Sequence, residues 1–151
     1  MRDLLLLVFA ALAACVIPLQ AIINGRLGQV VANPFLAALI SFFSGFAALV
    51  LVLLATTPGV PSLPPGTSFG KIPWHLFSGG VLGAVFVTTV LVLVPRIGAA
   101  NVIAATIVGQ LIMSVVIEHF GILGAPQSNV TLTKVAGCAL LICGMLLIQR
   151  R

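Results

Sequence analysis

The chain has 151 residues, of which 61% are hydrophobic and 6% charged, and its formal net charge is +5. A soluble domain of this length cannot cover its surface with so few polar side chains, so the composition predicts an all-α integral membrane protein. The basic excess does not indicate a nucleic-acid partner, because the Lys and Arg residues are scattered at the ends of apolar runs, where cationic side chains reach lipid headgroups.

The first apolar run covers about residues 4–31 and is long enough to cross a bilayer of about 30 Å at about 1.5 Å per residue. The segment ending at Cys15 resembles a lipoprotein processing site, but the apolar pattern continues past it, so we expect an uncleaved helix. Pro18 should kink this helix, because it lacks a backbone donor and its ring clashes with the preceding turn.

Two amide side chains, Gln20 and Asn24, follow the expected kink at a spacing that places them on one helix face. A proline and two amides in a spanning helix favour one of two structures. Either the amides line a cavity that binds a substrate, or they hydrogen-bond between helices and hold the bundle together. The spacing leaves both alternatives open.

The second run covers about residues 34–56. Ala37, Ser41 and Gly45 follow one another at four-residue steps, which predicts a groove where another helix approaches closely. Ser41 is also a candidate for the substrate cavity, although a serine in this setting can instead bond to its own helix. Residues 57–73 are rich in Pro and Gly and predict an exposed loop.

The third run covers about residues 74–95 and begins with Trp74, a residue typical of the membrane interface. Gly79 and Gly83 have the GxxxG spacing that allows close helix packing. We expect this helix to end near Val94, before the following proline.

The fourth run covers about residues 98–120 and carries a polar stripe, since Thr106, Gln110, Ser114 and Glu118 follow at four-residue steps on one face. Gln110 lies near the middle of the span, where a buried amide needs hydrogen-bonding partners. Gln110 and Ser114 are therefore candidates for the substrate cavity.

Glu118 is one of two acidic residues in the chain, and two roles fit it. As an intramembrane carboxyl it would couple transport to protons or bind substrate. Alternatively, because it lies near the helix end, it lies at headgroup depth and pairs with His119, Lys134 or an arginine of a partner chain.

The fifth run covers about residues 130–149 and contains Gly137 and Gly144, which favour helix packing. We expect no metal and no cofactor, because the three cysteines lie in apolar runs without metal-site spacing. These cysteines are Cys15, Cys138 and Cys143. An enzyme is not expected, since no nucleophile, base and orienting group occur at useful spacing.

An odd number of spans places the two termini on opposite sides of the membrane, so the Lys and Arg residues divide between two faces. One face has Arg2, Lys71 and Lys134, and the other has Arg26, Arg96, Arg150 and Arg151. Three against four gives almost no orientation bias. A bundle without bias can insert both ways, and two opposed copies form an inverted pair, so we expect an antiparallel dual-topology homodimer.

These features together resemble the YdcZ family, a five-helix family of unknown function in the drug/metabolite transporter superfamily. The matching residues occur almost from end to end: Gln20, Asn24, Leu27, Gly28, Pro34, Ser41, Gly45, Trp74, Gly79, Gly80, Gly83, Pro95, Gly98, Gly109, Gln110, Ser114, Glu118, Gly121, Gly137 and Gly144. The family more often has Asp where this chain has Glu118. The resemblance implies dual-topology single proteins, opposed pairs or fused copies.

The last helix, with Gly137 and Gly144, also looks like that of small multidrug resistance transporters, where it is a dimerisation arm. The resemblance implies the same role here. Those relatives carry a membrane-embedded glutamate in their first helix, which binds proton and substrate. This chain has Gln20 and Asn24 there instead, which counts against proton-coupled export of drug cations.

The sequence therefore predicts a multi-pass transporter of the bacterial inner membrane, a single domain over residues 1–151 that forms half of an inverted-repeat transporter. It would move a small metabolite or a drug-like molecule by alternating access. Gln20, Asn24, Gln110 and Ser114 would line the cavity. The alternatives are a non-transporting membrane subunit and a lipid flippase.

Overall fold

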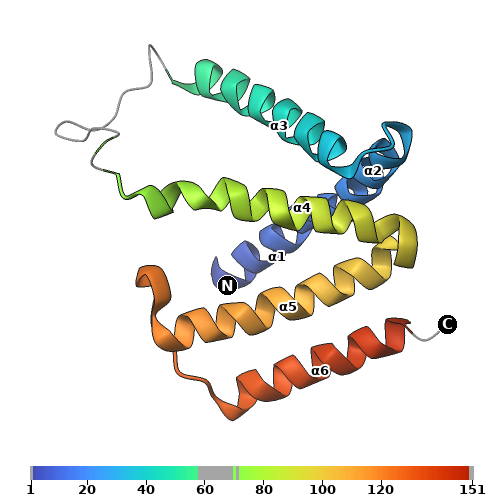
Figure 1. Cartoon of the computed structure of the whole chain (residues 1–151). Helices are drawn as coiled ribbons and strands as arrows, with labels where there is room; N and C mark the ends of the chain where they lie inside the picture. Colours follow the sequence, from blue (N-terminus) through green and yellow to red (C-terminus); the bar gives the residue numbers. More distant parts are fainter. Residues whose placement is uncertain (1, 58–69, 71, 150–151) are drawn as a thin grey trace. The chain divides into compact units, whose positions relative to one another are not determined.

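The computed structural model describes residues 2–57, 70 and 72–149 of the chain. Within these residues, five helical segments are long and apolar enough to cross a membrane, which confirms the five predicted spans (Figure 1). The helices are α1 (Arg2–Ala14), α2 (Val16–Val30), α3 (Pro34–Thr56), η2 (Trp74–Phe77), α4 (Ser78–Ile97), α5 (Ala99–Phe120), η3 (Ile122–Gly124) and α6 (Leu132–Gln149). Most of the loop predicted at residues 57–73 lies outside the described residues.

The first span is broken between α1 and α2 at Cys15, three residues before Pro18. Pro18 has no N–H to donate to the carbonyl of Ala14, and its ring crowds that carbonyl, so the helix is interrupted one turn before the proline. The Cys15 N–H instead donates to the Leu12 carbonyl at 3.1 Å. The kink that Pro18 predicts is therefore present, and it lies upstream of the proline.

The third span does not end near Val94, as the sequence suggested, because α4 continues through Pro95 to Ile97. A proline in the last turn removes only one hydrogen bond of the helix ladder. The Pro95 ring also packs against α2, since a Cβ at Gly25 would lie 3.5 Å from Pro95 Cγ. The prediction was wrong because the proline contributes packing at this position.

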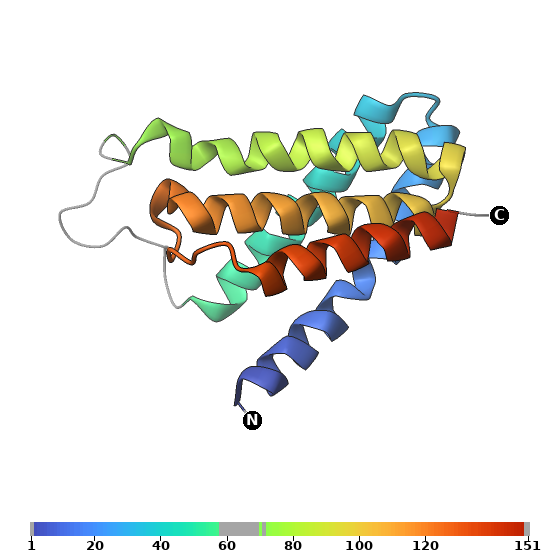
Figure 2. The same cartoon turned by 90° about the horizontal axis from the view of Figure 1, so that it is seen from below.

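By its internal contacts the chain divides into two compact units, residues 1–95 and 96–151. In the first unit, α2 packs against α3, and a small core forms where α3 begins and α4 approaches its end. That core contains Ala37, Ala38 and Leu91, with Leu27 and Val31 partly buried against it. From this packed end, α3 and α4 diverge toward the loop that joins them (Figures 1 and 2).

Local signals position α3 and the close contact beneath it. Asn33 caps α3, because its side-chain oxygen accepts hydrogen bonds from the N–H groups of Phe35 at 3.0 Å and Leu36 at 3.1 Å. Gly28 lets α2 approach α4, since a Cβ there would lie only 2.6 Å from Leu91 Cδ2. The packed end of the first unit therefore depends on the Asn33 cap and on a glycine, Gly28, at the point of close approach.

The second unit is a hairpin of α5 and α6, which lie side by side in both views (Figures 1 and 2). Gly98 precedes α5 with φ 84° and ψ 151°, a conformation that L residues avoid, and Gly121 ends α5 in the left-handed region at φ 60°. The Asn101 amide donates to the Ile97 carbonyl at 2.7 Å and so braces the junction before α5.

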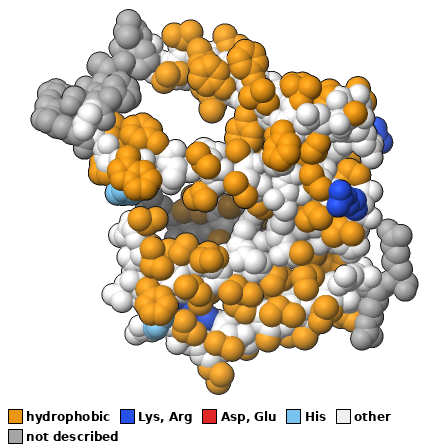
Figure 3. All heavy atoms as spheres, in the orientation of Figure 1, with side chains coloured by type: hydrophobic (Ala, Val, Ile, Leu, Met, Phe, Trp, Pro, Cys, Tyr) orange, Lys and Arg blue, Asp and Glu red, His pale blue; other side chains and the backbone are white. Residues whose placement is uncertain are grey.

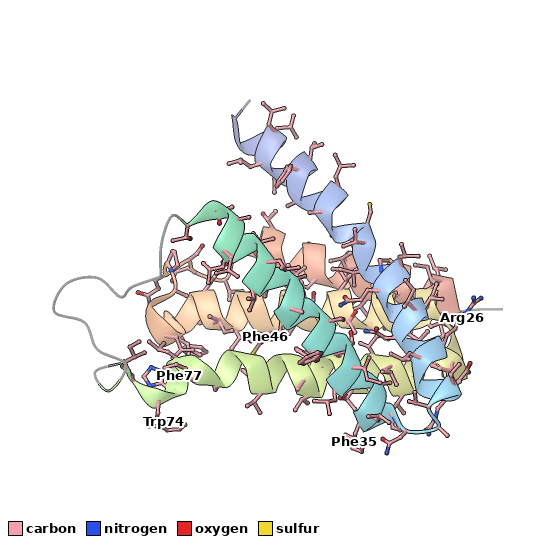
Figure 4. All side chains as sticks on the ribbon, turned by 90° about the horizontal axis from the view of Figure 1, so that it is seen from above. Arg26, Phe35, Phe46, Trp74 and Phe77 are labelled. Carbon is pink, nitrogen blue, oxygen red and sulfur yellow. The ribbon has the colours of Figure 1, made fainter. Side chains whose placement is uncertain are left out.

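Hydrophobic side chains cover much of the face shown in Figure 3, as expected for helices that face lipid tails. In the first unit, Trp74 and Phe77 lie in η2, directly before α4, at the opposite end from Arg26 and Phe35 (Figure 4). Trp74 is 83% exposed. An aromatic pair at one end and an arginine at the other fit the two membrane interfaces.

Candidate functional site

A pocket of about 330 Å³ lies in the first unit between α2, α3 and α4. Its described lining residues are Gln20, Ser41, Phe42, Gly45, Phe46, Leu49 and Val87. The pocket brings Gln20 of α2 together with Ser41 of α3, two residues that the sequence places in the substrate cavity. Gly45, a predicted packing residue, lines the same pocket. That these residues contact a substrate stays a prediction.

The space exists because a glycine and a diverging helix leave it unfilled. A Cβ built at Gly45 would meet no described atom within 4 Å. On the other side, α3 reaches α4 through a side chain, since a Cβ at Gly83 would lie 3.7 Å from the tip of the Phe42 ring. Figure 3 shows open space between α3 and α4. The pocket therefore lies between the packed end and the open end of the unit.

The polar groups of the pocket differ from other hydroxyls of these helices. The Ser44 hydroxyl donates to the Ser41 carbonyl at 2.8 Å, and the Thr89 hydroxyl donates to the Val85 carbonyl at 2.8 Å. Such bonds return the hydroxyl to its own helix. The hydrogen bonds among the described residues include none from the Gln20 amide or the Ser41 hydroxyl. Both groups are therefore available to a bound molecule.

Asn24 does not line this pocket, although it lies one turn beyond Gln20 on α2. Its side chain is buried, with 6% of the residue exposed. The neighbouring Gly25 packs against Val94 and Pro95 of α4. The two amides of the first span therefore have different surroundings, and a cavity role for Asn24 stays a prediction.

Gln110 and Ser114 lie on α5, in the second unit, and both are exposed there. One turn earlier, the Thr106 hydroxyl donates to the Ile103 carbonyl at 2.9 Å. The described pocket belongs wholly to the first unit. A cavity shared by the two sets of polar residues stays a prediction.

Glu118 forms an ion pair at the end of the α5–α6 hairpin. Lys134 Nζ lies 3.1 Å from Glu118 Oε2 and donates to Ser128 Oγ at 2.9 Å. The Ser128 N–H donates to the Glu118 carbonyl at 3.0 Å. Lys134 is among the partners that the sequence suggests for an interfacial Glu118, and the pair joins the last turn of α5 to the first turn of α6. A coupling role for Glu118 stays a prediction.

Four of the glycines predicted to support packing or dimerisation have open space in front of them. A Cβ at Gly45, Gly79, Gly137 or Gly144 would meet no described atom of this chain within 4 Å. Gly83 contacts Phe42 alone among the described side chains. Their role in contact with a second copy stays a prediction.

Sequence reasoning missed the apolar wall of the pocket and a second pocket. Phe42, Phe46 and Leu49 lie at steps of four and three residues, a signal of a shared face that marks lipid contact equally well. The second pocket, of about 520 Å³, lies along the face of α4 that carries Thr88 and Thr89, two polar residues that sequence reasoning did not connect with a pocket. It is lined by Phe35, Val81, Ala84, Val85, Thr88, Thr89, Val92 and Leu93.

A comparison with known families identifies the chain. A family model described as "Putative inner membrane exporter, YdcZ" matches residues 5–147 and thus extends into all five spans. No match was found among curated proteins or among solved structures. The chain therefore belongs to the YdcZ family and is a multi-pass protein of the inner membrane.

Proposed function

We propose that the protein exports a small molecule across the inner membrane by alternating access, and that the pocket between α2, α3 and α4 forms part of its binding site. The observation that carries this proposal is the meeting of Gln20 and Ser41 in a pocket of about 330 Å³. Ligand sites are concave and mostly apolar, with a few polar groups that orient the ligand. The family match supports export.

The form of the first unit supports alternating access. The unit is packed around Ala37 and Leu91 at one end, whereas α3 and α4 diverge at the other (Figure 1). The face of α4 toward α3 carries Gly79 and Gly83, so a helix can approach it without displacing side chains. A pocket between a closed and an open end suits a protein that exposes its site to one side at a time.

An inverted homodimer would supply the second half of the transporter. The nearly equal division of Lys and Arg between the two faces favours insertion in both orientations. Gly137 and Gly144 leave two positions on the surface of α6 without side chains, and the second copy would pack closely there. Two opposed copies would each contribute one pocket, related by a two-fold axis in the membrane plane.

Removal of the Gln20 amide should lower export. Proteoliposomes are loaded with a mixture of metabolites and drugs. Mass spectrometry then identifies the compounds that leave them faster than they leave equally loaded liposomes without the protein. Gln20→Leu should slow that efflux about tenfold, because a lost hydrogen bond to a bound molecule costs about 1.4 kcal/mol. Gln29→Leu is the matched control, since Gln29 is exposed on the same helix and lies outside the pocket.

Two results of this assay would contradict the proposal. If every compound left the proteoliposomes at the rate measured for liposomes without the protein, the result would argue against transport and favour a non-transporting subunit. Equal rates in Gln20→Leu and the unchanged protein would remove the pocket from the transport path.

Glu118→Gln tests the coupling role in the same assay, because a coupling carboxyl must ionise whereas a structural one tolerates the amide.

The charge balance makes a separate prediction about topology. Reporters fused to the C-terminus should detect it on both sides of the membrane. Removal of one charge by Arg26→Gln should shift the population, because three positive charges on each face leave no excess. Addition of one Lys to the face of Arg26 should shift it in the opposite direction. A fixed orientation in all three proteins would refute the antiparallel homodimer.

A further inference from the structure

The side chains that line the pocket of Gln20 and Ser41 indicate which class of molecule this pocket would bind. We propose that the pocket selects uncharged molecules that combine a flat apolar body with a hydrogen-bonding group. Gln20 and Ser41 would bind the polar group, and Phe42 and Phe46 would pack on the apolar body. This inference rests on the proposed function, because it names the substrate class of the same site.

The first reason is that none of the described residues lining the pocket is charged. Five of them are apolar, and the two polar ones are an amide and a hydroxyl. An ion that leaves water for such a site loses hydration without gaining a counter-charge, which is far more costly than the transfer of a neutral group. Glu118, the acidic residue whose side chain is described, is already paired with Lys134.

The second reason is the aromatic wall. Phe42 and Phe46 stand four residues apart on α3, so their rings lie on one face of the helix and line the pocket together (Figure 4 labels Phe46). The tip of the Phe42 ring faces Gly83 of α4, since a Cβ built at Gly83 would lie 3.7 Å from it. Phenyl rings favour flat apolar partners by stacked or edge-on contact.

The third reason is the pair of polar side chains that line the pocket, Gln20 of α2 and Ser41 of α3. A glutamine amide offers a donor and an acceptor, and a serine hydroxyl offers the same, so together they complement an amide or a hydroxyl group. A pocket of about 330 Å³ is close to the lower end of the roughly 300–1,000 Å³ range for ligand sites. The site therefore suits a small molecule with one such group.

Three probes that share an indole ring test the charge preference. They are indole-3-acetamide, which is neutral, tryptamine, which is a cation at pH 7, and indole-3-acetate, which is an anion. Binding of each to the purified protein in lipid nanodiscs is measured by equilibrium dialysis. We expect the amide to bind at least tenfold more tightly than either ion.

Variants assign the binding to the pocket. Gln20→Leu and Phe46→Ala should each weaken amide binding at least tenfold. Gln29→Leu and Phe43→Ala are matched controls on the same helices, since neither residue lines the pocket, and they should bind as the unchanged protein does. Circular dichroism of each variant verifies that the helices are retained.

Equal or tighter binding of either ion would overturn the proposal. So would a lack of amide binding at up to about 10 mM, or amide binding that Gln20→Leu and Phe46→Ala leave unchanged. Failure of transport is distinguishable from these results. Selective amide binding without efflux from proteoliposomes would refute the proposed export and leave the pocket chemistry intact, whereas efflux that favours tryptamine would refute the pocket chemistry alone.

Discussion

Gly28→Leu is expected to destabilise the protein by about 3 kcal/mol, the upper part of the usual cost of overpacking a filled core. A Cβ at Gly28 would lie 2.6 Å from Leu91 Cδ2 and 3.8 Å from Ala37 Cβ. Leu91 is only 3% exposed and belongs to the core of the first unit, so any shift of its side chain must displace neighbouring core residues. The added side chain would force α2 away from α4.

Unfolding of the purified protein in mixed detergent micelles by increasing SDS measures this effect, with the fluorescence of Trp74, the single tryptophan, as the signal. Gly109→Leu is the matched control, because a Cβ there meets no described atom within 4 Å. Leu91→Ala in the Gly28→Leu background should recover part of the loss, since it makes room for the new side chain. Equal stability of Gly28→Leu and Gly109→Leu would contradict the packing of α2 on α4.

Gly98→Ala is expected to destabilise the protein by about 1–3 kcal/mol, because φ 84° with ψ 151° is a conformation that only glycine adopts without strain. The backbone cannot relax freely there, since α5 starts at the next residue and Asn101 bonds back to Ile97 across the junction. The same SDS titration measures the change.

Gly109→Ala is the comparison within α5, where alanine should be neutral or stabilising by about 0.5–1 kcal/mol because it favours the helix. The difference between these two alanine variants isolates the cost of the backbone conformation at Gly98. An unchanged midpoint for Gly98→Ala would mean that the junction before α5 adopts another conformation in micelles.

Two prolines show how far sequence reasoning extends. Pro18 interrupts its span, as a proline inside a helix predicts, and the break lies at the carbonyl that it leaves without a donor. Pro95 is compatible with α4, because it stands in the last turn and its ring packs near Gly25. The residue type predicted a helix break in both cases, and the position of Pro95 in the last turn together with its contact near Gly25 accounts for the difference.

The polar residues give the same lesson for the candidate site. Spacing along α2 groups Gln20 with Asn24, yet the structure places Gln20 at a pocket with Ser41 and buries Asn24 outside it. Spacing along α5 gave Glu118 two roles, and the structure pairs it with Lys134 of the next helix. Periodicity within one helix reports which side chains share a face, but it does not report what that face meets.

The sequence by itself determined that this is a membrane protein with five spans, because the length and apolar content of a run decide whether it can cross a bilayer. Local chemistry also accounts for the Asn33 cap of α3 and for the glycine that ends α5. Only the tertiary structure decided that Gln20, Ser41 and two phenylalanines share a pocket. The physical reason is that lipid tails are as apolar as leucine, so a hydrophobic face looks the same in the sequence whether it packs on lipid, on another helix or on a substrate.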